Sequence, residues 1–221
     1  MDRLLRLTSS ASLKEKRLVD LLAGRSSSEP QLKEAVENAQ ALGSLELAAL
    51  PATPDAVRGL VQALRAVDPT AALNIAALRS WNAVVTGGTG TFRASERTRE
   101  GGPPPAPPAF VGSRLALLEE WLNGDSGREL KPAQQGALVM ARIVEVLPFE
   151  DGNGRVARLA ASHVMVRGGM RPPILRAGDS GRLEDALQRA FRFETEPLCA
   201  LLEEASERAL DVMIEALAGK E

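Results

Sequence analysis

The chain has 221 residues, 44% of them hydrophobic and 25% charged, as in an ordinary soluble globular protein of one large or two small domains. A formal charge of −2 provides no general basic surface, so nucleic acid is an unlikely partner on electrostatic grounds. A single cysteine, Cys199, excludes an internal disulfide, and no run is long enough to span a membrane, so we expect a cytoplasmic protein with no membrane contact.

Apolar positions recur at helical spacing along most of the chain and predict an all-α protein. Aromatic residues make up only 3%, so the core must be built from leucine, alanine and valine. Ser26-Ser27-Ser28, Pro51 and Asp68-Pro69-Thr70 separate the first helices or cap them. The predicted helices of this first part are residues 12–24, 30–50, 54–66 and 70–85.

Residues 86–111 form the long irregular segment of the sequence. Gly87-Gly88-Thr89-Gly90 cannot continue a helix, and the proline run from Pro103 to Pro108 favours extended polyproline geometry. Loops of this length are usually functional or disordered. We predict a small β-hairpin here, with a disordered excursion as the alternative.

Helical spacing resumes after this segment. Gly124 ends one helix, and Gly168-Gly169 followed by Pro172-Pro173 ends another. The predicted helices of the second part are residues 113–123, 132–146, 154–167, 181–193 and 197–218.

The stretch from Leu147 to Arg158, LPFEDGNGRVAR, is the most informative part of the chain. Gly152 and Gly154 flank Asn153, which lets successive backbone N–H groups converge on a phosphate at the start of a helix. Arg155 and Arg158 are three residues apart and therefore share a helical face. Asp151 is well placed for Mg²⁺, which takes one or two carboxylates plus phosphate oxygens.

This stretch resembles the signature of the Fic (Fido) domain family, His-Pro-Phe-x-(Asp/Glu)-Gly-Asn-Gly-Arg-x-x-Arg, except at its first position. The resemblance implies a helical bundle that uses Mg²⁺ and ATP or another nucleotide to transfer AMP to a protein hydroxyl. Carried over position by position, it implies Asp151 for the metal and Arg158 for the terminal phosphate. The residues that it implies for the other phosphates are Gly152, Asn153, Gly154 and Arg155. Leu147 takes the position of the catalytic histidine without its chemistry.

The order of elements extends the resemblance over about residues 70–205. We therefore divide the chain into an amino-terminal helical segment (1–68), a Fic-like core (69–205) and a continuation of the last helix (206–221). Within residues 86–111, Phe92 and Arg93 match a flap that, in the family, docks a target protein segment as an added strand. A target protein on this flap is thus an implied partner, beside the nucleotide.

Glu37-Asn38 resembles the inhibitory Fic motif (Ser/Thr)-x-x-x-Glu-(Gly/Asn), although Lys33 stands at its Ser/Thr position. The resemblance implies that Glu37 pairs with Arg158 and competes with the phosphate for its charge. The alternative is a solvent-facing carboxylate on an amphipathic helix.

Three hypotheses for function follow. In the first, which we favour, the protein binds a nucleotide or another phosphorylated ligand and has degenerated as an AMP transferase. In the second it is an active protein adenylyltransferase, because proton transfer typically contributes only about 10²–10⁴-fold to a rate. In the third it transfers another group from a diphosphate-linked donor. The sole histidine, His163, lies two helical turns beyond Arg155 and is expected to be a core or groove residue.

Overall fold

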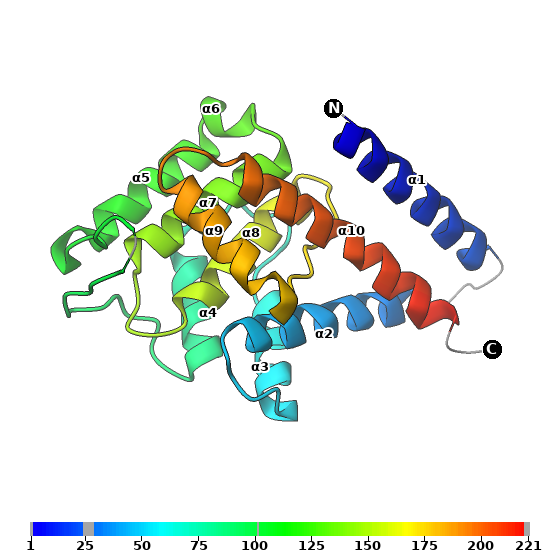
Figure 1. Ribbon diagram of the computed structural model, residues 1–221. Helices are drawn as coiled ribbons and strands as arrows, with labels where there is room; N and C mark the ends of the chain where they lie inside the picture. Colours follow the sequence, from blue (N-terminus) through cyan, green and yellow to red (C-terminus); the bar gives the residue numbers. More distant parts are fainter. Residues whose placement is uncertain (1, 24–28, 101, 219–221) are drawn as a thin grey trace.

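The computed structural model describes residues 2–23, 29–100 and 102–218, and these are helical or irregular throughout (Figure 1). The α-helices are α1 (Asp2–Leu22), α2 (Glu29–Leu47), α3 (Pro54–Arg65), α4 (Ile75–Thr86), α5 (Val111–Asn123), α6 (Asp125–Arg128), α7 (Pro132–Val146), α8 (Asn153–Arg167), α9 (Ser180–Ala190) and α10 (Glu196–Ala218). Two short 3₁₀ turns, η1 (Pro108–Phe110) and η2 (Ala177–Asp179), precede α5 and α9.

Helices α7 and α8 form the centre of the molecule and pack directly against each other (Figure 1). Their contact is close because small side chains face it: a Cβ on Gly136 would lie 2.8 Å from the Met165 Cγ. Ala157, Ala160 and Ala161 of α8 are fully buried. Helices α2, α4, α5 and α10 pack around this pair, so the loop between α7 and α8 is held from several sides.

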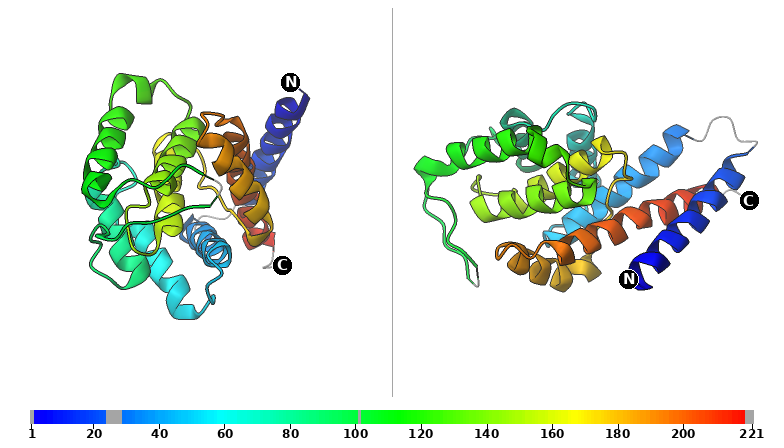
Figure 2. Two further views of the ribbon diagram at one scale, coloured as in Figure 1. Left: turned by 60° about the vertical axis from the view of Figure 1, so that its left-hand side comes forward. Right: turned by 90° about the horizontal axis from the view of Figure 1, so that it is seen from above.

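Helix α1 lies beside α10, apart from the central pair (Figure 1, Figure 2). The Lys14 ammonium contacts Glu207 at 2.8 Å and Asp211 at 2.9 Å, which ties the two helices together. No helix of the described ranges combines the length and the apolar character needed to cross a bilayer.

Local capping explains several helix starts. The Thr53 hydroxyl accepts a hydrogen bond from the Ala56 N–H at the start of α3, and Pro54 occupies the first helical position. Helix α4 begins at Ile75, and its N-cap residue is Asn74, whose side chain accepts from the Ala77 N–H at 2.8 Å. The predicted cap at Asp68 is wrong, because this carboxylate accepts from the Thr70 N–H and hydroxyl in a local turn instead.

The all-α architecture is as predicted, but the small β-hairpin is wrong: no strand occurs in residues 2–23, 29–100 or 102–218. A hairpin needs a ladder of backbone hydrogen bonds, and the proline run Pro103–Pro108 lacks most of the N–H donors for one. The segment is held differently. The Arg93 N–H donates to the Pro148 carbonyl at 2.9 Å, and the side chains of Arg93, Ser95, Arg97 and Arg99 make the further contacts.

Candidate phosphate-binding site

Helix α7 ends at Val146, and the C-cap residue Leu147 adopts a left-handed backbone conformation with φ 47° and ψ 64°. This conformation is uncommon for a leucine and costs on the order of 1–2 kcal/mol. Pro148 follows and excludes a continued helix, because its ring disfavours the α conformation in the residue before it. The side chain of Leu147 is half-buried at the mouth of the loop that joins α7 to α8.

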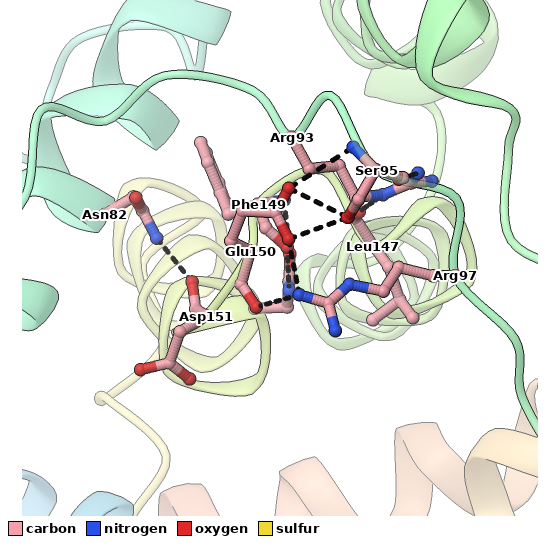
Figure 3. A network of polar contacts seen from close by, with 9 residues as sticks. Asn82, Arg93, Ser95, Arg97, Leu147, Phe149, Glu150 and Asp151 are labelled. Carbon is pink, nitrogen blue, oxygen red and sulfur yellow. Dashed lines mark hydrogen bonds and ion pairs between the residues drawn. The ribbon is translucent and has the colours of Figure 1, made fainter.

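The loop is closed by the side chain of Asn153, the first residue of α8. Its Oδ1 accepts from the Phe149 N–H at 2.9 Å, and its Nδ2 donates to the Phe149 carbonyl at 2.8 Å. Phe149 itself is buried in the core. From α4, the Asn82 Nδ2 donates to the Asp151 carbonyl at 2.8 Å, as Figure 3 shows. Both ends of the loop are therefore fixed by side chains.

Gly152 turns the chain into α8 with φ 81°. A Cβ at this position would lie 2.9 Å from the Thr86 Cγ2 and 3.0 Å from the Asn82 Nδ2. Glycine is thus required by both conformation and space. In the described part of the chain, the N–H groups of Asn153, Gly154 and Arg155 have no acceptor, as expected at a helix start. These donors at the positive end of the helix dipole suit an anion.

We expect Gly152→Ala to destabilise the protein more than Gly169→Ala. Gly169 has φ 86° and open space around its Cα, so alanine there carries only the left-handed penalty of about 1–2 kcal/mol. At Gly152 the close contacts with α4 add to this penalty. Urea unfolding of both variants measures the difference, and equal losses of stability would contradict the close packing of this loop on α4.

Arg155 and Asp151 form an ion pair one turn apart. The Arg155 Nη2 lies 2.8 Å from the Asp151 Oδ2, and Nη1 donates to the Val85 carbonyl at the end of α4. The Arg155 side chain is only 9% exposed, whereas that of Asp151 is 78% exposed. The buried cation is thus oriented by α4, and the carboxylate lies toward solvent.

Arg158 connects α8 to α2. Its Nε donates to the Ser44 hydroxyl at 3.0 Å and its Nη2 to the Ser44 carbonyl at 2.8 Å, near the end of α2 where helix carbonyls lack partners. The third nitrogen, Nη1, has no hydrogen-bond partner within the described residues, and a Cβ on Gly154 would lie 3.3 Å from it. Burial, with a smaller effect from Arg155, lowers the pKa of Arg158 to about 10, so it stays charged at neutral pH.

Glu37 does not meet Arg158 in this structure. Its buried carboxylate accepts from the Arg65 Nε at 2.8 Å, and Lys33 lies 3.9 Å away. Glu37 and Ser44 are seven residues apart on α2, about 10 Å along the helix axis. Arg158 contacts Ser44 and not Glu37. The inhibitory role of Glu37 stays a prediction.

Arg93 anchors the segment after α4 on the end of α7. Its buried guanidinium donates to the carbonyls of Leu147 at 2.6 Å, Val146 at 3.3 Å and Ser95 at 2.6 Å, and to that of Ala106. The Phe92 ring packs on Phe149 with 5.7 Å between ring centroids. The two residues predicted for the flap therefore lie against the loop that carries the motif.

Glu150 binds the same segment from the loop (Figure 3). Its carboxylate accepts from the Ser95 hydroxyl at 2.9 Å and pairs with Arg97. Hydrogen bonds from Ser95 and then Arg97 lower the pKa of Glu150 below its usual value. Figure 3 shows the Asp151 side chain pointing away from this contact. Glu150 thus holds the segment in place and is ionised at neutral pH.

The structure brings together most of the predicted residues: Leu147, Asp151, Gly152, Asn153, Gly154, Arg155, Arg158, Phe92 and Arg93. Sequence reasoning missed Asn82, Ser44 and Arg65, which position the Asp151 backbone, Arg158 and Glu37. Their residue types carry no local signal, because only the packing of α4, α2 and α3 brings them to these partners.

A family model described as the Fic/DOC family matches residues 72–165. This part of the chain is similar to the Fic/DOC family. Among curated proteins it is 29% identical over 125 residues to "Protein adenylyltransferase Fic" of Culex quinquefasciatus, a match that covers 57% of this chain and 25% of that protein. The chain thus spans about a quarter of the length of this relative.

Solved structures share the fold. A Fic domain containing signaling protein from Bacteroides thetaiotaomicron superposes with a TM-score of 0.78 at 17% identity, covering 96% of this chain and 99% of that one. The BepC protein of Bartonella tribocorum, with bound AMPPNP, superposes with a TM-score of 0.55 at 21% identity, covering 68% of this chain and 82% of that one. The Fic fold of the chain therefore extends beyond the matched residues 72–165.

Proposed function

We propose that this protein binds a nucleotide through its phosphates at residues 151–158 and is degenerate as an AMP transferase. One observation carries this proposal. At the start of α8, backbone N–H groups without an acceptor among the described residues lie together with Arg155 and Arg158, beside Leu147, whose side chain cannot take a proton. Support comes from the Fic family, whose curated members here are named protein adenylyltransferases, and from the AMPPNP bound to BepC.

Each residue of the site has a distinct task in this proposal. Gly152 and Gly154 let the backbone approach the phosphates, while Asn153 shapes the loop with its side chain and offers its own N–H. Arg155 supplies a buried charge. Arg158 offers Nη1 to the terminal phosphate without leaving Ser44, because its other nitrogens make that contact.

Asp151 fits Mg²⁺ only together with a bound nucleotide. No group of three or more His, Cys, Asp or Glu side chains with metal-binding geometry occurs in residues 2–23, 29–100 and 102–218. Mg²⁺ commonly takes one or two carboxylates and completes its coordination with phosphate oxygens and water. The exposed Asp151 carboxylate can provide this one ligand, and the metal would neutralise phosphate charge.

Within the part of the chain that the structure describes, the two carboxylates that follow Leu147 in the loop are both engaged in other contacts. The Glu150 carboxylate is occupied by Ser95 and Arg97, and Asp151 by Arg155. His163 donates its Nε2–H to the Ala71 carbonyl at 2.9 Å, on another side of α8. A target hydroxyl at the loop would therefore keep its proton, which lowers the rate of transfer. We propose that a protein target docks on the flap segment, residues 86–111, of which Phe92, Arg93 and Ser95 contact the loop.

Isothermal titration calorimetry with the wild-type protein tests the binding proposal. ATP, ADP and pyrophosphate, each with Mg²⁺, are expected to bind, whereas adenosine, which lacks the phosphates, is expected to bind at least about 10-fold more weakly because it loses the charge-assisted contacts. Equal affinity for adenosine and ATP, or no binding of any phosphate compound, would refute the proposal.

A further inference from the structure

A cavity of about 860 Å³ lies between α2, α8 and the end of α3 with the segment that follows it, and Leu18 and Leu22 of α1 and Met213 of α10 border it. Its volume is in the range of small-molecule sites, about 300–1,000 Å³. None of its lining residues belongs to the phosphate-binding loop at 147–158. Binding of phosphates at this loop therefore does not explain the cavity.

The wall of this cavity is mainly apolar and elongated. Leu32 and Val36 of α2 face Leu159 and Val166 of α8, with Trp81 at one side. Leu159 and Val166 are seven residues apart, so the floor runs for about 10 Å along α8. The Trp81 indole N–H donates to the Ala63 carbonyl at 2.8 Å, and its ring packs against His163 with 5.6 Å between ring centroids. Such a wall suits an elongated hydrocarbon or aromatic body.

Arg171 provides a cation in this wall that is poorly neutralised. Its Nη2 lies 3.5 Å from the Glu15 carboxylate, Nη1 donates only to the Met213 sulfur at 3.4 Å, and Nε is buried without a partner among the described residues. A guanidinium has five N–H donors and binds carboxylates in pairs of hydrogen bonds. Arg171 therefore has donors to spare for an anion.

Two other cations line the cavity, Arg65 and Lys33, and both lie at the Glu37 carboxylate, whereas Arg171 has a buried donor without a partner among the described residues. Glu29 is exposed at the rim. Burial lowers the pKa of His163, so this imidazole is neutral at neutral pH and does not compete for the anion.

We propose that the cavity is a second ligand site, which takes an amphipathic monocarboxylate. Its carboxylate pairs with Arg171, and its elongated apolar body lies along α8 toward Trp81. The site is separate from the nucleotide site, so the two proposals stand or fall independently. Both sites nevertheless share α8, and Gln40 of the cavity wall lies one turn before Ser44, the partner of Arg158.

The test uses tryptophan quenching by brominated probes. The chain has two tryptophans, so Trp121→Phe leaves Trp81 as the sole emitter, and bromine quenches tryptophan only at short range. In this background, 11-bromoundecanoate and 11-bromoundecan-1-ol are titrated at pH 8; they share one chain and differ only in the head group. We expect saturable quenching by both, with the carboxylate about 10-fold tighter because of its contact with Arg171.

Arg171→Gln should remove this preference and leave the alcohol affinity unchanged, whereas the matched change Arg114→Gln, at an exposed arginine of α5, should alter neither. Val166→Phe, which narrows the cavity, should weaken both probes. The comparison of the two probes in the Trp121→Phe protein, whose cavity wall is unsubstituted, remains valid even where a further variant does not fold. No saturable quenching, equal affinity for the two probes, or a preference that survives Arg171→Gln in a folded protein would overturn the proposal.

Discussion

Leu147→His is expected to raise AMP transfer over the wild-type protein by about 10²–10⁴-fold, the usual contribution of a general base. The new imidazole would stand at the mouth of the loop, beside the start of α8 where we place the phosphates. Histidine also tolerates the left-handed conformation of this position better than leucine does. Mass spectrometry of the intact protein after incubation with Mg²⁺ and ATP measures self-modification.

Leu147→Asn is the matched control for this experiment. Asparagine also favours the left-handed conformation but has no group that takes a proton at neutral pH, so it should gain nothing. Transfer by the wild type as fast as by Leu147→His would mean that another residue serves as base, and would refute the degenerate-enzyme proposal.

A second substitution, Glu37→Ala, distinguishes the effect of the missing base from the effect of inhibition by Glu37. Because Glu37 is paired with Arg65 and the Arg158 Nη1 has no partner among the described residues, Leu147→His alone should show most of the gain. Adding Glu37→Ala leaves Arg65, which is about half exposed, free to interact with water. A large further rise in the double variant would show that Glu37 leaves Arg65 and restrains the site.

Arg155→Gln is expected to weaken binding of Mg²⁺–ATP by about 10- to 150-fold, which corresponds to a charge-assisted contact of about 1.5–3 kcal/mol. The buried guanidinium is already oriented by Asp151 and the Val85 carbonyl, so little entropy is lost when it binds a phosphate. Calorimetry measures the affinity.

Arg114→Gln controls for the loss of one positive charge, since Arg114 is exposed on α5. Circular dichroism checks that Arg155→Gln keeps its helices. An unchanged affinity in a folded Arg155→Gln protein would show that Arg155 does not contact the phosphates. The phosphate site would then consist of the backbone donors and Arg158.

Helix periodicity predicted the central elements closely. Residues 132–146 were predicted and found as α7, and α8 begins one residue before the predicted start. Helix α1 extends from Asp2, ten residues before the predicted start, although its residues are on average polar. The hairpin was wrong because glycine and proline signals show where a helix stops, while the contacts of the following segment depend on Arg93 and distant carbonyls.

The motif was predictable because its residues are consecutive, and the supporting residues were not. Ser44 and Arg158 are 114 positions apart, and the contact between them depends on how α2 is rotated against α8. Periodicity shows which face of a helix is buried but not which residue on the facing helix it meets. For the same reason the sequence could not predict that Glu37 contacts Arg65.

The two hydrogen bonds between the Asn153 side chain and the Phe149 backbone have a consequence for the kinetics of phosphate binding. Asn82 and Asn153 hold the loop in shape before any anion arrives, so the entropy of ordering it is lost during folding. A phosphate would therefore bind to a loop that is already ordered. In stopped-flow measurements its association should follow a single exponential whose rate rises in proportion to ligand concentration, without the plateau that a slow loop closure would impose.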